Sequence, residues 1–155
     1  MNELHITSKS PDETMKLGKK LATRLKPGSI VCLHGELGSG KTTLVKGLAE
    51  GLKLKQQKVK SPSFVLMNVY EGKLPLYHFD FYRLENLREI EEIGYEEFLY
   101  GNGISAIEWA DKLQELYPKE CLKIELSHAS ANERRLVLTP QGNGYETILK
   151  GLKTP

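Results

Sequence analysis

The segment Gly35-Glu36-Leu37-Gly38-Ser39-Gly40-Lys41-Thr42 is the most informative part of the sequence, because it fits the phosphate-binding pattern G-x-x-x-x-G-K-[ST]. The pattern is informative only where a strand precedes it and a helix follows it. Residues 29–33 form a short apolar run that predicts a buried strand, and apolar residues recur at helical spacing over residues 44–52. The segments on both sides of the motif therefore match the required order. The segment therefore predicts a P-loop that binds a nucleoside triphosphate, and not a glycine turn that binds nothing, but it does not identify the reaction.

The chemistry of phosphate binding explains the spacing of this motif. Gly38 and Gly40 have no Cβ, so the backbone can curl until successive N–H groups point at a β-phosphate. The helix that follows adds its positive end and its unpaired amides. Lys41 can bridge the β- and γ-phosphates, Thr42 can bind Mg²⁺, and Thr43 can reach the α-phosphate. The residues expected to bind nucleotide here are Glu36, Leu37, Gly38, Ser39, Gly40, Lys41, Thr42 and Thr43.

The composition describes an ordinary globular protein. A length of 155 residues predicts a single domain over residues 1–155, and the net charge of +2 is too small to argue for nucleic acid as a partner. No apolar run approaches the roughly 20 residues that span a bilayer, and the N-terminus lacks the apolar core of a signal peptide. Cys32 and Cys121 show no Cys-x-x-Cys spacing, which favours inert buried thiols. We expect a cytoplasmic protein without a membrane partner.

A helix is expected near the start of the chain, after a short edge strand at residues 4–7. Ser10 can cap this helix, Pro11 suits its first position, and Glu13 completes a capping box. Leucines at helical spacing continue the pattern as far as the Pro-Gly pair at residues 27–28, which is expected to end it.

Alternating apolar residues predict further strands in the rest of the chain. The expected elements are a hairpin made of residues 64–70 and 74–82, a buried strand at Ile104–Glu108, a short helix at Ala110–Leu116, an antiparallel pair at residues 122–126 and 135–138, and a closing helix at residues 144–152. Together with the P-loop unit they predict an α/β protein. Its expected architecture is a three-layer P-loop NTPase-like fold, whose central mixed sheet has a parallel core and antiparallel additions.

Two carboxylates compete for the position beside a metal ion. Asp80 comes near the end of its run, where period-two alternation places it on the same face as His78. Glu108 ends an apolar strand, which is the form that a Walker B segment takes. Ligands of open α/β sheets bind at the carboxyl ends of strands, so one acid can hold Mg²⁺ while the other orients the attacking water. The alternative is that each is a surface or capping acid. For His78, a packed strand residue is favoured over a base.

Trp109 is the only tryptophan and directly follows Glu108. A core aromatic is the simplest interpretation of an indole ring. Because the next residues leave the strand for a polar helix, we expect the ring at the mouth of the strand, beside the metal site.

Two charged segments leave their interpretation open. Residues 53–60 contain four lysines and no acid, which favours a solvated loop over a basic patch that faces RNA or an acidic partner. A helix is expected where Asn86 and Glu89 predict a capping box and Gly94 predicts the end, and six glutamates lie in and around it, between residues 85 and 97. A solvated helix face is favoured there over a docking surface for a basic partner.

With these pieces in place, the sequence resembles the TsaE family of small bacterial P-loop ATPases almost from end to end. The resemblance rests on residues 34–43, on Ser-Pro-Ser-Phe at 61–64, on His-Phe-Asp-Phe-Tyr-Arg at 78–83 and on Ile-Glu-Trp at 107–109. The first motif is generic among P-loop proteins, whereas the other three are specific at these distances. The family usually has threonine at the position of Ser63, so a hydroxyl is kept but is less rigidly placed.

The resemblance implies roles for individual residues. Thr42 and Glu108 are expected to hold Mg²⁺, and Asp80, Glu108 and Lys41 to form the catalytic centre. Residues 61–64 are expected to sense the nucleotide. The family's adenine site corresponds here to Ser10 and Pro11 together with residues 132–134, of which Asn132 is expected to bind.

The resemblance also implies a function, a Mg²⁺-dependent hydrolysis of ATP to ADP and phosphate. The family supports threonylcarbamoyl modification of adenosine 37 of tRNA by acting on a complex of TsaD and TsaB, so tRNA is met only indirectly, through that complex. A small-molecule kinase is the alternative enzyme. It is weakened because the five arginines form no basic lid and none is recognisable as an internal finger. A nucleotide-dependent binding module without turnover remains if both acids are structural.

Overall fold

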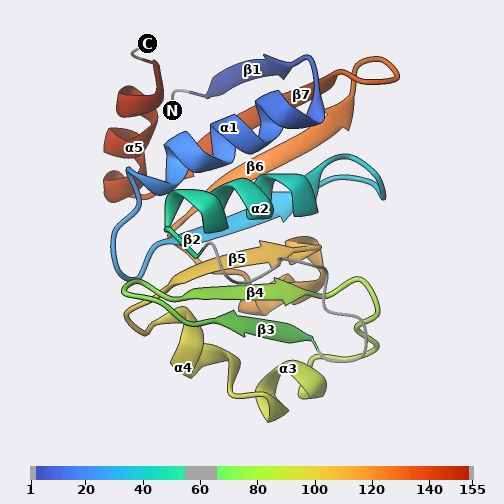
Figure 1. The fold of residues 1–155 in the computed structure, drawn as a ribbon. Coiled ribbons are helices and arrows are strands. Elements are labelled where there is room, and N and C mark those ends of the chain that lie inside the picture. Colours follow the sequence, from blue (N-terminus) through green and yellow to red (C-terminus); the bar gives the residue numbers. More distant parts are fainter. Residues whose placement is uncertain (1–2, 55–65, 154–155) are drawn as a thin grey trace.

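A seven-stranded mixed sheet forms the centre of the computed structural model, which describes residues 3–54 and 66–153 (Figure 1). The strands are β1 (Leu4–Ser8), β2 (Ile30–His34), β3 (Met67–Tyr70), β4 (Leu76–Asp80), β5 (Ile104–Glu108), β6 (Cys121–His128) and β7 (Arg134–Gln141). Their order is β1-β7-β6-β2-β5-β4-β3. The adjacent strands β6, β2, β5 and β4 are parallel, whereas β1, β7 and β3 pair antiparallel with their neighbours. The expected parallel core with antiparallel additions is confirmed.

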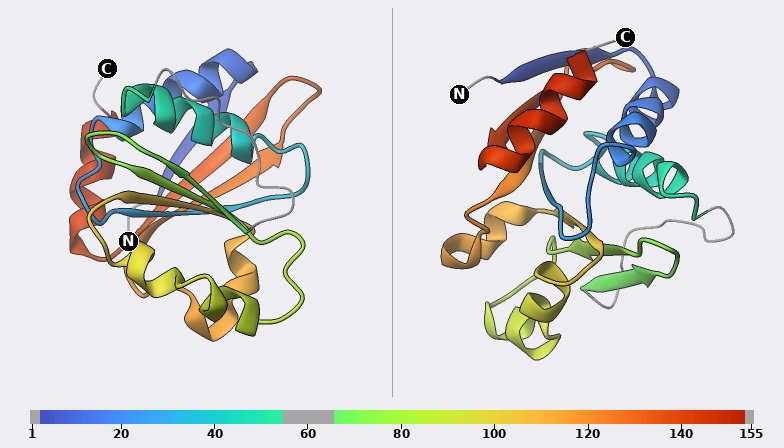
Figure 2. Two further views of the ribbon diagram at one scale, coloured as in Figure 1. Left: turned by 60° about the horizontal axis from the view of Figure 1, so that its bottom comes forward. Right: turned by 90° about the vertical axis from the view of Figure 1, so that its left-hand side faces the viewer.

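Helices cover both faces of this sheet. They are α1 (Pro11–Ala22), α2 (Lys41–Gly51), α3 (Arg88–Glu92), α4 (Tyr95–Leu99), the 3₁₀ helix η1 (Ala110–Leu116) and α5 (Asn143–Lys153). Figure 2 shows α1 and α2 on one face, and α3, α4 and η1 on the other. The arrangement confirms the three-layer α/β fold.

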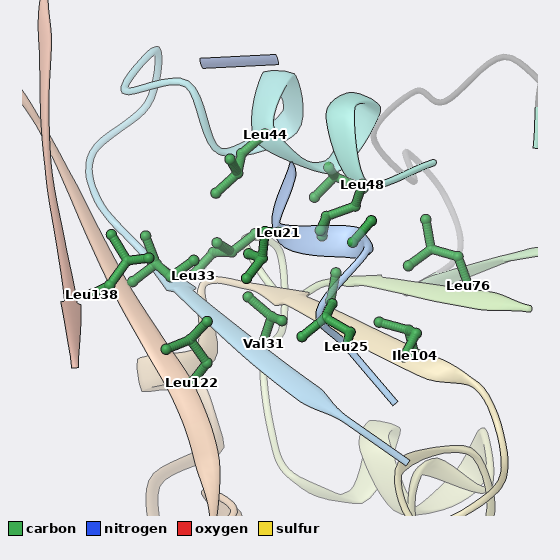
Figure 3. Packing of buried hydrophobic residues seen from close by; sticks show 14 of the residues in the cluster. Leu21, Leu25, Val31, Leu33, Leu44, Leu48, Leu76, Ile104, Leu122 and Leu138 are labelled. Atoms are coloured by element: carbon green, nitrogen blue, oxygen red, sulfur yellow. The ribbon is translucent and has the colours of Figure 1, made fainter. Parts of the chain in front are cut away.

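Two clusters of buried side chains hold the layers together. The larger lies between the sheet and the α1–α2 layer, and its fully buried members include Leu21, Val31, Leu33, Leu44 and Leu48 (Figure 3). Burying a side chain of this size stabilises a fold by about 1.5–3 kcal/mol. The second cluster lies under α3, α4 and η1 and contains the two cysteines, which are free and fully buried as expected. The strand that leads into the P-loop is therefore packed on both faces.

Glycine lets α1 and α2 approach each other closely. A Cβ on Gly18 would lie 2.4 Å from the backbone oxygen of Leu44, and a Cβ on Gly47 would lie 2.2 Å from that of Met15. Because both obstacles are backbone atoms, they cannot swing aside as a side chain could. The P-loop helix is thereby held directly against α1, whose first turn lines a cavity together with the P-loop.

The start of α1 follows the prediction, but its end does not. The hydroxyl of Ser10 accepts a hydrogen bond of 3.2 Å from the N–H of Glu13, while the carboxylate of Glu13 accepts from the N–H of Lys9 at 3.1 Å. The helix ends at Ala22, before the Pro-Gly pair at residues 27–28 that the sequence pattern predicts as its end. The hydroxyl of Thr23 donates to the carbonyl oxygen of Lys20 at 2.7 Å, which satisfies a carbonyl of the last turn.

The glutamate-rich segment corrects a second prediction. Leu87, and not Asn86, occupies the N-cap of α3 and makes no side-chain capping bond. The carboxylate of Glu89 instead accepts a hydrogen bond of 2.9 Å from the N–H of Glu85, the residue before Asn86. Gly94 ends α3 with φ +72°, as expected, but α4 begins directly after it.

Smaller differences concern the C-terminal half. The helix predicted at Ala110–Leu116 is a 3₁₀ helix broken at Gln114, and the predicted antiparallel pair is longer at both ends than expected. The predicted segments at residues 55–60 and 61–64 lie outside the described residues.

Candidate functional site

A cavity of about 930 Å³ opens where β2, β4 and β5 reach their carboxyl ends. Its size is at the upper end of the range for small-molecule pockets. Its walls are formed by Pro11, Thr14, residues 37–43, Leu66, Asp80, Tyr82, Arg83, Glu89, Glu92, Ile93, Glu108, Trp109, Asn132 and Arg134. Most residues that the sequence assigned to nucleotide and metal binding are thus brought together at one edge of the sheet.

The P-loop adopts a conformation that requires glycine at two positions. Gly38 has φ +77° and Gly40 has φ +105°, both in the left-handed region that residues with a Cβ rarely adopt. Gly40 is the N-cap of α2 and has no side chain with which to cap it. The first turn of α2 therefore presents its amides and its positive end to the cavity, which is the arrangement that binds phosphate.

Lys41 is held at the base of the cavity. Its side chain is mostly buried, and its Nζ donates to the carbonyl oxygens of Gly35 and, at 3.0 Å, of Glu36. The ammonium also lies 4.1 Å from the ring centroid of Trp109. Burial lowers the pKa of Lys41, while the carboxylates of Glu108 and Asp80 act in the opposite direction. Both carbonyl partners are neutral, so a phosphate oxygen would be a stronger acceptor for this ammonium.

Thr42 and Glu108 bring a hydroxyl and a carboxylate together in the cavity. The hydroxyl of Thr42 lies 3.1 Å from Oε1 and 3.0 Å from Oε2 of Glu108, whose side chain is almost fully buried at the end of β5. Hydroxyl and carboxylate oxygens suit Mg²⁺, which protein sites hold through one or two such groups together with substrate phosphates. No group of three or more His, Cys, Asp or Glu side chains that could hold a metal occurs in residues 3–54 and 66–153. The donor set therefore fits Mg²⁺ bound jointly with a triphosphate.

Asp80 lies beside Glu108 because their strands are adjacent and in register. The two residues are Cα partners in the parallel β4–β5 pair, so both strands deliver a carboxylate at the same edge. Oδ1 of Asp80 accepts a hydrogen bond of 3.0 Å from the N–H of Tyr82. Burial raises the pKa of Asp80, with a smaller contribution from Glu108, although the bond from Tyr82 opposes the shift. Asp80 is thus a half-buried carboxylate that faces the cavity.

Trp109 lies at the mouth of β5, as predicted. Its ring lines the cavity and packs against Tyr82 with 5.0 Å between the ring centroids. Its backbone has φ +58°, which is uncommon for a bulky residue and is maintained only where the surrounding structure imposes it. The left-handed turn directs the chain from β5 into η1 and keeps the indole beside Lys41.

The residues predicted for adenine are only partly gathered here. Pro11 and Asn132 line the cavity, whereas Ser10 uses its hydroxyl as a helix cap and does not line it. Glu36, which was predicted to bind nucleotide as part of the P-loop, does not line the cavity either. Its carbonyl oxygen accepts a hydrogen bond from Lys41. For all four residues, contact with a nucleotide stays a prediction.

Two residues of the site have contacts that sequence reasoning missed. The sequence favours a packed strand residue for His78, which is indeed fully buried, but its Nε2 also lies 2.5 Å from Oε2 of Glu108. Arg83 lines the cavity although no role was expected of it, whereas Arg134, which also lines the cavity, belongs to the segment expected near adenine. The available signal was the motif at residues 78–83, which contains both His78 and Arg83.

Comparisons with known proteins agree with this geometry. A model of the family described as "Threonylcarbamoyl adenosine biosynthesis protein TsaE" matches residues 8–136. The tRNA threonylcarbamoyladenosine biosynthesis protein TsaE of Bacillus subtilis is 40% identical over 153 residues, which cover 98% of this chain and 95% of that protein. The protein of the same name from Treponema pallidum is 38% identical over 135 residues, 87% of this chain and 99% of its own.

A solved structure extends the similarity to three dimensions. The crystal structure of Bacillus subtilis YdiB superimposes with a TM-score of 0.81 at 36% identity, covering 98% of this chain and 95% of its own. The fold, the P-loop with its nucleotide-binding geometry and the match over most of the chain lead to one conclusion. The chain belongs to the TsaE family.

Proposed function

We propose that this chain is a Mg²⁺-dependent ATPase that supports threonylcarbamoyl modification of tRNA adenosine 37. The observation that carries the proposal is the contact of Thr42 with Glu108 at the foot of the P-loop, with hydroxyl–carboxylate distances of 3.0 and 3.1 Å. A P-loop alone binds phosphate, but a P-loop threonine beside an acid at a strand end forms the metal-binding part of a hydrolytic site. The description of the family supports the pathway.

Each residue of the site has a task in this reaction. Mg²⁺, when bound, would neutralise part of the negative charge of the phosphates. Thr42 and Glu108 are the residues that would hold it. The ammonium of Lys41 is placed to leave its carbonyl partners and stabilise the negative charge of the phosphates. Asp80, half-buried at the end of β4, would orient the attacking water.

The partner that we propose is the complex of TsaD and TsaB, through which the chain would act on tRNA indirectly. Two exposed apolar side chains support docking near the cavity, since Leu37 is 63% exposed, Tyr82 is 42% exposed and both line its walls. A partner that covers these two side chains would remove their apolar surface from water. In the described part of the chain, none of the helices has the length and apolar character needed to cross a bilayer. We propose a cytoplasmic location.

Phosphate release from ATP tests the proposal. We expect slow turnover alone, on the order of 10⁻⁴ to 10⁻³ s⁻¹, as in P-loop enzymes that have no arginine finger in place. Adding TsaD and TsaB should accelerate it. Lys41→Ala should abolish the acceleration, whereas Lys46→Ala, an exposed lysine on the same helix, serves as the matched control.

Two other results would contradict this function. Transfer of phosphate to an added metabolite at kinase-like rates of roughly 1–100 s⁻¹ would identify a small-molecule kinase. Tight ATP binding with no phosphate release, with or without the partners, would identify a binding module.

A further inference from the structure

The buried imidazole of His78 is directed at the candidate metal ligand. His78 is fully buried within β4, and its Nε2 lies 2.5 Å from Oε2 of Glu108. The contact is diagonal across the parallel β4–β5 pair, because the strand partner of His78 is Ala106, two residues before Glu108. An ionised carboxylate can only accept hydrogen bonds, so Nε2 is the donor.

The other ring nitrogen of His78 is left unsatisfied. Nδ1 has no hydrogen-bond partner in the part of the chain that the structure describes, although the residue is entirely enclosed. A buried polar atom without a partner costs free energy that an apolar side chain of similar volume would avoid. Leu76, on the same face of β4 as His78, is fully buried, so this side of the sheet accommodates a large apolar group. The packing of the sheet alone therefore does not explain a histidine here, whereas a donor for Glu108 does.

The second contact of Glu108 shows what this donor accomplishes. The Thr42 hydroxyl is within reach of both carboxylate oxygens, at 3.1 and 3.0 Å, and does not by itself select one of them. His78 contacts Oε2 only. Holding Oε2 fixes the rotation of the carboxylate, while the Thr42 hydroxyl stays within reach of both oxygens. Histidine–carboxylate contacts of this kind orient the ligands of metal sites, and their loss typically weakens metal affinity by about 10–100-fold.

We propose that His78 is a positioning residue that orients Glu108 for Mg²⁺ bound with the nucleotide. The inference rests on the proposed Mg²⁺–ATP site, but it does not require that ATP is hydrolysed.

The test measures binding of a non-hydrolysable ATP analogue at increasing Mg²⁺ concentrations. In His78→Leu we expect the Mg²⁺ concentration that gives half of the maximal enhancement of analogue binding to rise at least tenfold. Affinity for the analogue without Mg²⁺ should stay within about twofold of the wild type, because the P-loop is untouched. His78→Gln, whose amide nitrogen can occupy the position of Nε2, should restore the wild-type Mg²⁺ dependence. A wild-type Mg²⁺ dependence in folded His78→Leu would overturn the inference.

A second pair of variants keeps the test decisive if His78→Leu does not fold. Gln and Asn are both polar amides, but Asn places its nitrogen near the position of Nδ1, too far from Glu108. We expect Gln to retain the Mg²⁺ dependence and Asn to lose it, and equal dependence in both would overturn the inference. If the wild type bound the analogue equally well with and without Mg²⁺, the proposed function would instead be overturned. Mg²⁺-dependent binding without hydrolysis would overturn only the ATPase assignment and would support the positioning role.

Discussion

The guanidinium of Arg134 connects strand β7 to the P-loop, because its Nη2 donates a hydrogen bond of 3.2 Å to the carbonyl oxygen of Gly38. Its Nη1 lies 3.0–3.3 Å from three carbonyl oxygens of the preceding turn, those of Ser130, Ala131 and Glu133. One side chain thus closes the turn that contains Asn132 and also contacts the phosphate-binding loop. Two walls of the cavity are thereby held in a fixed relation.

Replacing Arg134 should weaken ATP binding even though the residue is far from the catalytic acids in sequence. Arg134→Gln removes the fork that reaches several carbonyls at once, and we expect ATP affinity to fall about fivefold, equivalent to about 1 kcal/mol for partly exposed bonds. Arg134→Lys keeps the charge but not the planar fork, so it should restore little of the loss. Isothermal titration calorimetry measures the effect. Arg135→Gln, an exposed neighbour on the same strand, is the control, and equal affinities for the two glutamine variants would contradict the role.

Asp80 should oppose stability when it is ionised. Burial raises its pKa in the folded protein, so between the unfolded and folded pKa values the folded state binds more protons and stability falls as pH rises. Above the folded pKa the destabilisation is complete. Asp80→Asn removes the charge and keeps an oxygen for the N–H of Tyr82, so its Tm at neutral pH should exceed that of the wild type.

Thermal unfolding at several pH values checks this expectation. The gain in Tm should shrink as the pH falls through the raised pKa, because the wild-type carboxyl is then also neutral. The variant should bind Mg·ATP and hydrolyse it poorly. A Tm difference that is constant across pH, or that favours the wild type at neutral pH, would argue against a buried charge at this position.

Trp109 should report nucleotide binding by its fluorescence. Its ring centroid lies 4.1 Å from Nζ of Lys41, so movement of that ammonium toward a phosphate changes the electric field at the indole. We expect a change in emission on adding Mg·ATP and a smaller one with Mg·ADP, which lacks the γ-phosphate. In Lys41→Ala the difference between the two nucleotides should disappear. Emission that is insensitive to both nucleotides, in protein shown by calorimetry to bind ATP, would contradict this explanation.

The contact between α1 and α2 should not tolerate a methyl group. In Gly18→Ala the added Cβ would lie 2.4 Å from a backbone oxygen, and overpacking of this kind costs about 1–3 kcal/mol. For a chain of this length that corresponds to a fall in Tm of roughly 2–12 °C. Gly144→Ala is the matched control, because nothing lies within 4 Å of the position that its methyl group would take and alanine favours helix over glycine. Equal Tm values for both variants would contradict the packing argument.

The local sequence pattern was sufficient to predict the P-loop, the strand before it and the helix after it. The P-loop, its strand and its helix are consecutive in the chain, so their order and their glycines specify the geometry directly. Glu108 was predictable as a strand-end acid for the same reason. Its partner was not, because His78 lies 30 residues away and meets it only through the pairing of two strands. The contact of Arg134 with Gly38 spans 96 residues and depends on how the β6–β7 hairpin folds over the loop.

The glutamate-rich segment shows a different limit. Its charges predicted one solvated helix, but Gly94 separates two short helices whose apolar residues face the core. The carboxylate of Glu89 accepts a hydrogen bond from the backbone N–H of Glu85, and not from the N–H of Asn86 that the predicted capping box would use. The sequence pattern of a short helix does not show which of two possible side-chain hydrogen bonds forms at its start.

The close approach of α1 and α2 also limits how this chain can diverge. The two helices belong to different parts of the sequence, yet Gly18 and Gly47 each meet the other helix through backbone atoms, so a larger residue at either position cannot be compensated by shrinking the side chain opposite. Recombining α1 from one relative with α2 from another will therefore succeed only when the parent of α1 carries glycine at position 18 and the parent of α2 carries glycine at position 47. A library that randomises either helix should retain glycine at these sites while it accepts many residues on the solvent-facing side.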